Sequence, residues 1–178
     1  MRRYACLSTF SSAIIEGIES GYLARVLVHA GYGVWATDAE EVDIGDQDGN
    51  NKIRWNTSPM ANNVEFANLT AIVEELTTRQ LIPDDIPKFI VGMSNGGAFS
   101  LVAGRTLNLN AAVVYCASGS ERVAAVTEVP TAWYLCEQDD NETVDKRKSV
   151  RNYEALKARD AATELYTHGP SPLYDQRF

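Results

Sequence analysis

One serine, Ser94, lies in a cluster of small residues between an apolar run and a run with helical spacing. Residues Gly92 to Gly96 read G-M-S-N-G and fit the G-x-S-x-G pattern of a serine on a strained strand-to-helix turn. On such a turn the Ser94 hydroxyl projects above the sheet as a nucleophile. The backbone N–H of Asn95, at the start of the helix, favours an oxyanion there. The pattern therefore indicates acyl-transfer chemistry, and its alternative is a plain glycine-rich turn.

The residues around this turn resemble a known family. The stretch VGMSNGGAFS is similar to the esterase, depolymerase and dienelactone-hydrolase-like branch of the α/β-hydrolase superfamily, whose turns often read G-x-S-x-G-G. The stretch from His29 to Asp38, HAGYGVWATD, also resembles that family's helix-to-strand passage ahead of the serine. The resemblance covers most of the chain. It implies a serine hydrolase that cleaves a small-molecule carboxylic ester.

The same resemblance implies a general base. In that family the triad follows the chain order Ser, Asp or Glu, His. His168 is the one histidine after Ser94 in this sequence, and it follows the last expected strand. The alternative is a surface histidine in the turn THGPSP. His29 precedes the serine, and we interpret it as a helix C-terminal residue, where its charge suits the helix dipole.

The resemblance also implies an orienting acid after the strand expected at 131–137. The family pattern there is G-x-x-D, and Cys136 to Asp139 matches it apart from Cys in place of Gly. Asp139 is therefore our first candidate and Asp140 the second. The alternative is a solvated acidic cap of the following helix. Glu121, after the preceding strand, is a more distant candidate.

In the implied mechanism, His168 takes the proton of Ser94 as the serine attacks the ester carbonyl. Asp139 holds the imidazole, and the Asn95 N–H supports the oxyanion. Water activated by His168 then releases the acid. Thioester or lactone hydrolysis on the same triad stays open, because a shared fold does not separate these reactions.

Short apolar strands alternate with helical patterns along the chain. Strands are expected at 32–37, 89–91, 111–117, 131–137 and 163–168, and helices at 12–30, 61–79, 98–106 and 141–159. The polar stretch 38–58 is expected to be a long loop. The alternation predicts an α/β fold: a mostly parallel sheet covered by helices on both faces, an α/β-hydrolase-like three-layer sandwich in one domain spanning 1–178.

Both ends depart from the family pattern. The family has a strand ending in a His-Gly type motif before its first helix, and the loop after it gives the second oxyanion N–H. Only RRYACLSTFSS precedes that helix here. Either Leu7 to Ser11 is a degenerate version of this loop, or the first strands are missing. HGPSPLYDQRF resembles a point where related proteins continue into further helices. A non-catalytic binding protein or truncated fragment with an incomplete oxyanion hole is therefore the alternative function.

The composition of the chain limits the classes of partner that we expect. The 178 residues carry a net charge of -8, and such a chain repels nucleic acid and anionic membranes, so we expect neither as a partner. No apolar run reaches the length of a membrane-spanning helix. The start of the chain lacks the apolar core and cleavage site of a signal peptide. Cys6, Cys116 and Cys136 are odd in number and far apart, which favours reduced thiols in a cytoplasmic chain.

No motif indicates a cofactor or a metal. Asp46, Asp48 and Gly49 imitate a calcium loop, but in that frame the first and last ligand positions are Ile44 and Trp55. No Cys/His spacing suggests zinc, and no Gly-rich phosphate loop is found. Trp35, Trp55 and Trp133 are interpreted as residues of the core or of a pocket wall.

Overall fold

A computed structural model describes residues 4–9, 18–37, 41–42, 52–53, 55–58, 63–83, 85–136 and 146–169. Within these residues, six strands form one sheet in the order β2-β1-β5-β6-β7-β8, and all its pairs are parallel. These strands are β1 Tyr4–Thr9, β2 Tyr32–Ala36, β5 Lys88–Met93, β6 Ala111–Tyr115, β7 Thr131–Cys136 and β8 Thr163–His168. The helices are α1 Ile18–His29, α2 Val64–Thr78, α3 Asn95–Thr106, α4 Glu121–Ala124 and α5 Lys146–Lys157.

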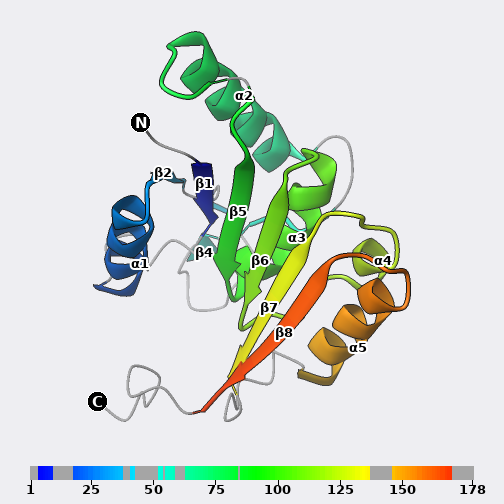
Figure 1. Cartoon of the computed structure of the whole chain (residues 1–178). Coiled ribbons are helices and arrows are strands. Elements are labelled where there is room, and N and C mark those ends of the chain that lie inside the picture. Colours follow the sequence, from blue (N-terminus) through cyan, green and yellow to red (C-terminus); the bar gives the residue numbers. More distant parts are fainter. Residues whose placement is uncertain are drawn as a thin grey trace.

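The strand order reverses direction at β1. The chain passes from β1 to β2 toward one edge, and then returns to place β5 on the other side of β1. Because crossovers between parallel strands are right-handed, α1 lies on one face of the sheet and α2, α3, α4 and α5 lie on the other. In Figure 1, α1 lies beside β2, whereas α5 lies along β8 at the opposite edge. The predicted three layers are therefore confirmed.

This reversal also locates the ligand-binding edge. In open α/β sheets, ligands bind outside the carboxyl ends of the strands, at the point where the strand order reverses. Here that point lies between β1 and β5, which pair from Ala5–Lys88 to Thr9–Gly92. The serine turn follows β5 directly, so the fold places it at this crevice.

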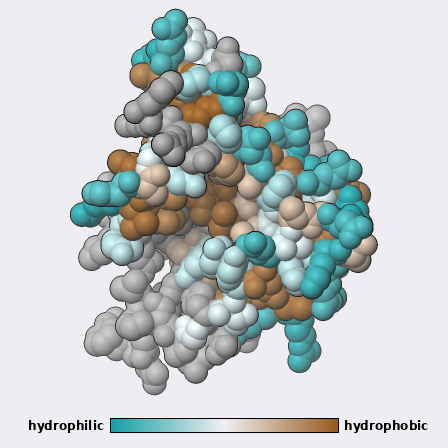
Figure 2. Space-filling model, viewed as in Figure 1, coloured by the Kyte–Doolittle hydropathy of each residue, from teal (hydrophilic) through white to brown (hydrophobic). Residues whose placement is uncertain are grey.

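The core lies between the sheet and α3. Eight residues of α3 are buried, and Phe99 and Leu101 are almost fully excluded from solvent. On the sheet, Ile90, Val114 and Trp133 face the same layer, and none of the three is exposed. The opposite face of the sheet is less covered. Figure 2 shows apolar surface over the middle strands beside α1.

Several predicted elements differ from the observed ones. β1 was not predicted, although it is an inner strand between β2 and β5. The stretch expected as a loop contains a two-stranded antiparallel ribbon, β3 Glu41–Val42 with β4 Lys52–Ile53, which corrects that expectation. The short helix α4 was also missed. α3 begins at Asn95, three residues before the predicted start, because Gly96 and Gly97 contribute nothing to an apolar helical pattern.

The N-terminal expectation is corrected in part. Residues Leu7 to Thr9, considered as a degenerate oxyanion loop, belong to β1. Residues 10–17, which would carry that loop, lie outside the described residues, so the second oxyanion donor stays a prediction. Among the described helices, none combines the length and the apolar character that crossing a bilayer requires.

Candidate active site

Ser94 joins β5 to α3 in a strained backbone conformation. Its φ is 54° and its ψ is -123°, a region that residues with a side chain rarely adopt. Such a conformation costs on the order of 1–3 kcal/mol and persists only where its surroundings hold it. Here the Ser94 N–H donates to the Tyr115 carbonyl at 2.9 Å, and the Ser94 carbonyl accepts from the Ala98 N–H at 3.1 Å. Within the described residues, the hydroxyl makes no capping hydrogen bond to α3.

Two glycines make this turn possible. A Cβ at Gly92 would lie 2.2 Å from the Gly96 carbonyl oxygen and 2.5 Å from Ser100 Oγ. A Cβ at Gly97 would lie 2.9 Å from both Ala117 Cβ and the Gly92 carbonyl oxygen. No real Cβ is accommodated at such distances. Glycine at these positions therefore lets the first turn of α3 press against the ends of β5 and β6.

Asn95 contributes through both its backbone and its side chain. As the first residue of α3, it presents its N–H where the helix dipole stabilises negative charge. Its side-chain Oδ1 accepts from the Trp55 N–H at 2.7 Å, and its Nδ2 donates to the Trp55 carbonyl at 3.3 Å. The residue beside the serine thus binds a segment forty positions earlier in the chain. Sequence reasoning missed this contact, because no local pattern signals it.

The segment 55–58 is held at both of its ends. The Trp55 ring stacks on Phe99, with 4.6 Å between ring centroids, and Phe99 also stacks on Phe66 at 5.4 Å. At the other end, Asn63 Nδ2 donates to the carbonyls of Asn56 and Ser58 at 2.7 and 2.9 Å. The segment is therefore fixed between the start of α2 and the first turn of α3.

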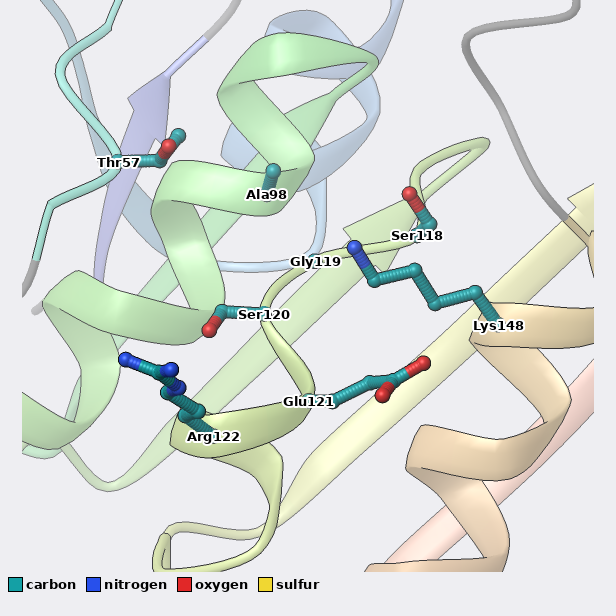
Figure 3. Close-up of a pocket in the computed structure, with 8 residues that line it drawn as sticks. All are labelled: Thr57, Ala98, Ser118, Gly119, Ser120, Glu121, Arg122 and Lys148. Atoms are coloured by element: carbon teal, nitrogen blue, oxygen red, sulfur yellow. The ribbon is translucent and has the colours of Figure 1, made fainter.

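A cavity of about 510 Å³ opens one turn of α3 beyond Ser94. Figure 3 shows its lining, which comes from three places besides Ala98 of α3: the segment 55–58, the loop after β6 together with the start of α4, and the start of α5. The lining residues are Thr57, Ala98, Ser118, Gly119, Ser120, Glu121, Arg122 and Lys148. Ser94 is not among them, so the cavity does not enclose the candidate nucleophile.

The sheet places His168 at the same edge as Ser94, at a distance. His168 ends β8 and pairs with Cys136, the last residue of β7. Along the ladder, Met93 pairs with Tyr115, Tyr115 with Tyr134, and Tyr134 with Tyr166. Three strand intervals, each about 4.8 Å, therefore separate β5 from β8. The ladder alone does not bring the imidazole to Ser94, and the pairing of these two residues stays a prediction.

The acid candidates are placed only in part. Asp139 and Asp140 lie outside the described residues, as do the neighbouring Glu137 and Glu142. The more distant candidate, Glu121, is exposed, and its Oε1 lies 2.8 Å from Arg151 Nη2 in an ion pair.

His29 lies in the last turn of α1, where its Nδ1 is 2.8 Å from the Arg25 carbonyl oxygen. The interpretation of His29 as a helix C-terminal residue is confirmed.

A row of tyrosines crosses the sheet toward β8. The rings of Tyr134 and Tyr166 stack with 4.7 Å between centroids, and Tyr115 lies 6.0 Å from Tyr134. The Tyr166 hydroxyl donates to the Glu164 carboxylate. This hydrogen bond, and then the charge of Glu164, raise the pKa of Tyr166 above its ordinary value.

The remaining predictions have mixed outcomes. Trp55 and Trp133 are core residues and Trp35 packs against the core, as predicted. Cys116 is buried and forms no disulfide within the described residues, whereas the side chains of Cys6 and Cys136 lie outside the described part of the structure. The calcium-like residues Asp46 to Gly49 lie outside the described residues. The described part of the chain holds no group of three or more His, Cys, Asp or Glu suited to a metal ion.

Comparison with known proteins identifies the fold. No protein-family model and no curated protein matches the sequence. Solved structures do match: Arabidopsis thaliana SOBER1 at TM-score 0.66 and 18% identity, over 95% of this chain and 90% of that one. Esterase PE8 matches at TM-score 0.68 and 19% identity, over 96% and 84% of the two chains. The Pyrococcus furiosus esterase Pf2001 matches at TM-score 0.68 and 14% identity, over 95% and 74%.

The chain has the α/β-hydrolase fold. In this fold the nucleophile occupies the sharp turn between a strand and a helix at the carboxyl edge of the sheet. Ser94 occupies that turn here, with the strained backbone that the position requires. The α/β-hydrolase fold thus explains why a non-glycine residue carries a positive φ at this point.

The strain at Ser94 predicts an unusual order of stabilities. We expect Ser94→Gly to have a free energy of unfolding about 1 kcal/mol higher than Ser94→Ala, because alanine keeps the strained Cβ and glycine does not. Urea unfolding of both variants measures the difference. At Ser120, where φ is -97°, we expect Ser120→Gly to have a lower free energy of unfolding than Ser120→Ala, because glycine there relieves no strain and only increases the conformational entropy of the unfolded chain. Equal stabilities at Ser94 would show that the turn is unstrained.

The Asn95 contact predicts a stability cost. Asn95→Ala keeps the backbone N–H of residue 95 but removes the two hydrogen bonds that the Asn95 side chain makes to the backbone of the buried residue Trp55. We expect urea unfolding to give a loss of about 1–3 kcal/mol. The control is Asn68→Ala, at an exposed position of α2, which should change stability by less than about 0.5 kcal/mol. A similar small effect at Asn95 would contradict the role of this contact in holding the segment 55–58.

Proposed function

We propose that this protein is a serine hydrolase that cleaves small or medium carboxylic esters through an acyl-enzyme. The observation that carries the proposal is the backbone of Ser94 at the carboxyl end of β5, whose φ of 54° and ψ of -123° lie outside the left-handed helical region. Residues held in such sparsely populated conformations cluster at active sites. Two solved structures of similar fold that are named esterases support the choice of ester as substrate.

In the proposed reaction, Ser94 Oγ attacks the ester carbonyl carbon and its proton passes to His168. The carbonyl oxygen becomes an oxyanion, which accepts a hydrogen bond from the Asn95 N–H. The tetrahedral intermediate collapses, and the alcohol leaves with the proton from His168. Water then attacks the acyl-enzyme, again with His168 as base, and releases the acid and free Ser94. Asp139 holds the imidazole and stabilises its charged form.

One observation favours a second candidate, a non-catalytic hydrolase-like binding protein. The strand ladder puts three intervals between β5 and β8, whereas proton transfer needs the imidazole within about 3 Å of Ser94 Oγ. Catalysis by His168 therefore requires its imidazole to reach Ser94 Oγ across this interval. A binding protein has no such requirement.

Covalent labelling separates the two candidates. A fluorophosphonate probe should label the protein, and Ser94→Ala should lose all labelling, because only an activated serine reacts with the probe. Intact-mass spectrometry and in-gel fluorescence measure the extent of labelling. The control is Thr78→Ala, an exposed hydroxyl residue at the end of α2, which should label like the parent chain. A folded parent chain without labelling would favour the binding protein.

The base and the acid have a separate test. His168→Gln should lower kcat for 4-nitrophenyl acetate at least about 10³-fold, and Asp139→Asn should lower it comparably. The control is His29→Gln, at the exposed end of α1, which should leave kcat within about twofold. Full activity of His168→Gln would show that another group accepts the proton. A loss with Asp140→Asn in place of Asp139→Asn would assign the acid to the second candidate.

A further inference from the structure

Trp55 contacts α3 at two positions that lie one helical turn apart. Its backbone N–H donates to Asn95 Oδ1 at 2.7 Å, and its carbonyl accepts from Asn95 Nδ2 at 3.3 Å. Its ring stacks on Phe99, with 4.6 Å between ring centroids and 21° between the ring planes. Asn95 and Phe99 are four residues apart, so they share one side of the helix. A single residue therefore bridges the first turn of α3.

The first turn of α3 receives little support from its own cap. Within the described residues, the Ser94 side chain makes no capping hydrogen bond, although such a bond commonly holds the start of a helix. The positive φ of Ser94 also stores strain, which unwinding of this turn would relieve. The first N–H groups of a helix have no partner inside the helix. The direction of the Asn95 N–H therefore depends on how firmly the turn is held from outside.

Trp55 belongs to the buried layer of the structure. It is 3% exposed, and Phe99, on which it stacks, also stacks on Phe66 of α2 with 5.4 Å between ring centroids. Asn63, the residue before α2, donates its Nδ2 to the Asn56 carbonyl at 2.7 Å. Trp55 is therefore fixed relative to α2, and its contacts extend this rigidity to the start of α3.

The amide of Asn95 is not explained by helix formation. Asparagine is a weaker helix former than alanine, because its side chain competes for nearby backbone groups. Here both polar ends of the amide bind a residue forty positions away in the chain. Asn95→Ala would favour the helix itself, so a loss of function in this variant reflects the lost contact with Trp55.

We propose that Trp55 is a positioning residue: through the Asn95 side chain and the Phe99 ring, it holds the Asn95 N–H in the direction that the oxyanion requires. This inference rests on the proposed ester hydrolysis. An oxyanion donor acts at full strength only when it lies about 2.7–3.1 Å from the place where the charge develops. A displacement of about 1 Å is enough to cost about 10²-fold in rate. Trp55 therefore acts on the rate of reaction and not on the binding of the ester.

Kinetics of three variants test the role of Trp55. Asn95→Ala removes the amide, and Trp55→Leu removes the stacked ring. We expect each to lower kcat for 4-nitrophenyl acetate about 10–100-fold. KM should stay within about threefold, because acylation and deacylation both pass through an oxyanion and slow together. Trp55→Phe keeps an aromatic ring against Phe99 and should retain kcat within about threefold.

The combination of the two changes tests whether they act together. Asn95→Ala and Trp55→Leu affect the same turn of α3, so the double variant should lose little more than the more damaging single variant. Losses that multiply would show that the two residues act independently, and would overturn the proposed connection.

A destabilised control separates positioning from general loosening. Ile82 is buried in a separate apolar cluster with Leu76 and Ile86. Ile82→Val removes one buried methylene group and should lower the midpoint of urea unfolding. It should leave kcat within about twofold. A fall in kcat comparable to that of Asn95→Ala would indicate that loosening of any part of the core lowers activity, and would contradict the role of Trp55.

A transition-state analogue reports on the oxyanion directly. When trifluoroacetone reacts, Ser94 Oγ bonds to its carbonyl carbon, the π electrons of that carbonyl become an oxyanion, and the serine proton passes to His168. With carbon-13 at this position, NMR across a range of pH gives the pKa of the hemiketal hydroxyl. A well-placed donor favours the charged form, so Asn95→Ala and Trp55→Leu should raise this pKa by about 1. An unchanged pKa would overturn the proposal.

These measurements distinguish failure of this inference from failure of the proposed function. A parent chain that hydrolyses the ester, with both variants at the parental kcat, would contradict the role of Trp55 and leave the hydrolase standing. A folded parent chain that neither reacts with a fluorophosphonate probe nor hydrolyses the ester would contradict the hydrolase, and this inference with it. Parallel losses of kcat and rises in the hemiketal pKa would support both.

Discussion

The close approach of β5 and α3 around Gly92 constrains the rest of this structure. With no side chain at Gly92 or Gly97, the first turn of α3 lies on the ends of β5 and β6. This contact lets α3 bury Phe99 and Leu101, each worth about 1.5–3 kcal/mol of apolar transfer. Ser94 then has to turn within one residue and takes the positive φ. Burial of α3 offsets the strain, so the fold itself maintains the strained conformation of Ser94.

Local sequence patterns predicted most of the larger helices and strands, but not the order of the strands in the sheet. β8 and the helical stretches follow from apolar spacing, and β8 matches its predicted bounds. β1 was missed because six residues with two small hydroxyl side chains at the end do not stand out as a strand. Its place between β2 and β5 depends on pairings with strands far along the chain. Such pairings are set by burial across the whole sheet, which no local window contains.

In the candidate site, too, local features could be predicted from the sequence and long-range contacts could not. The G-x-S-x-G pattern predicted Ser94 and the Asn95 N–H, because the local turn fixes both. The contact of Asn95 with Trp55, and a cavity built from four separate parts of the chain, depend on residues distant in sequence. The order Ser, acid, His can be taken from the sequence alone. The separation of β5 and β8 by three strand intervals follows only from the order of the strands in the sheet.

Asn95 links the proposed oxyanion position to the cavity. Its N–H is the proposed oxyanion donor, while its side chain holds Trp55, two residues before Thr57 on the cavity wall. A shift of the segment 55–58 would therefore alter the donor and the wall together.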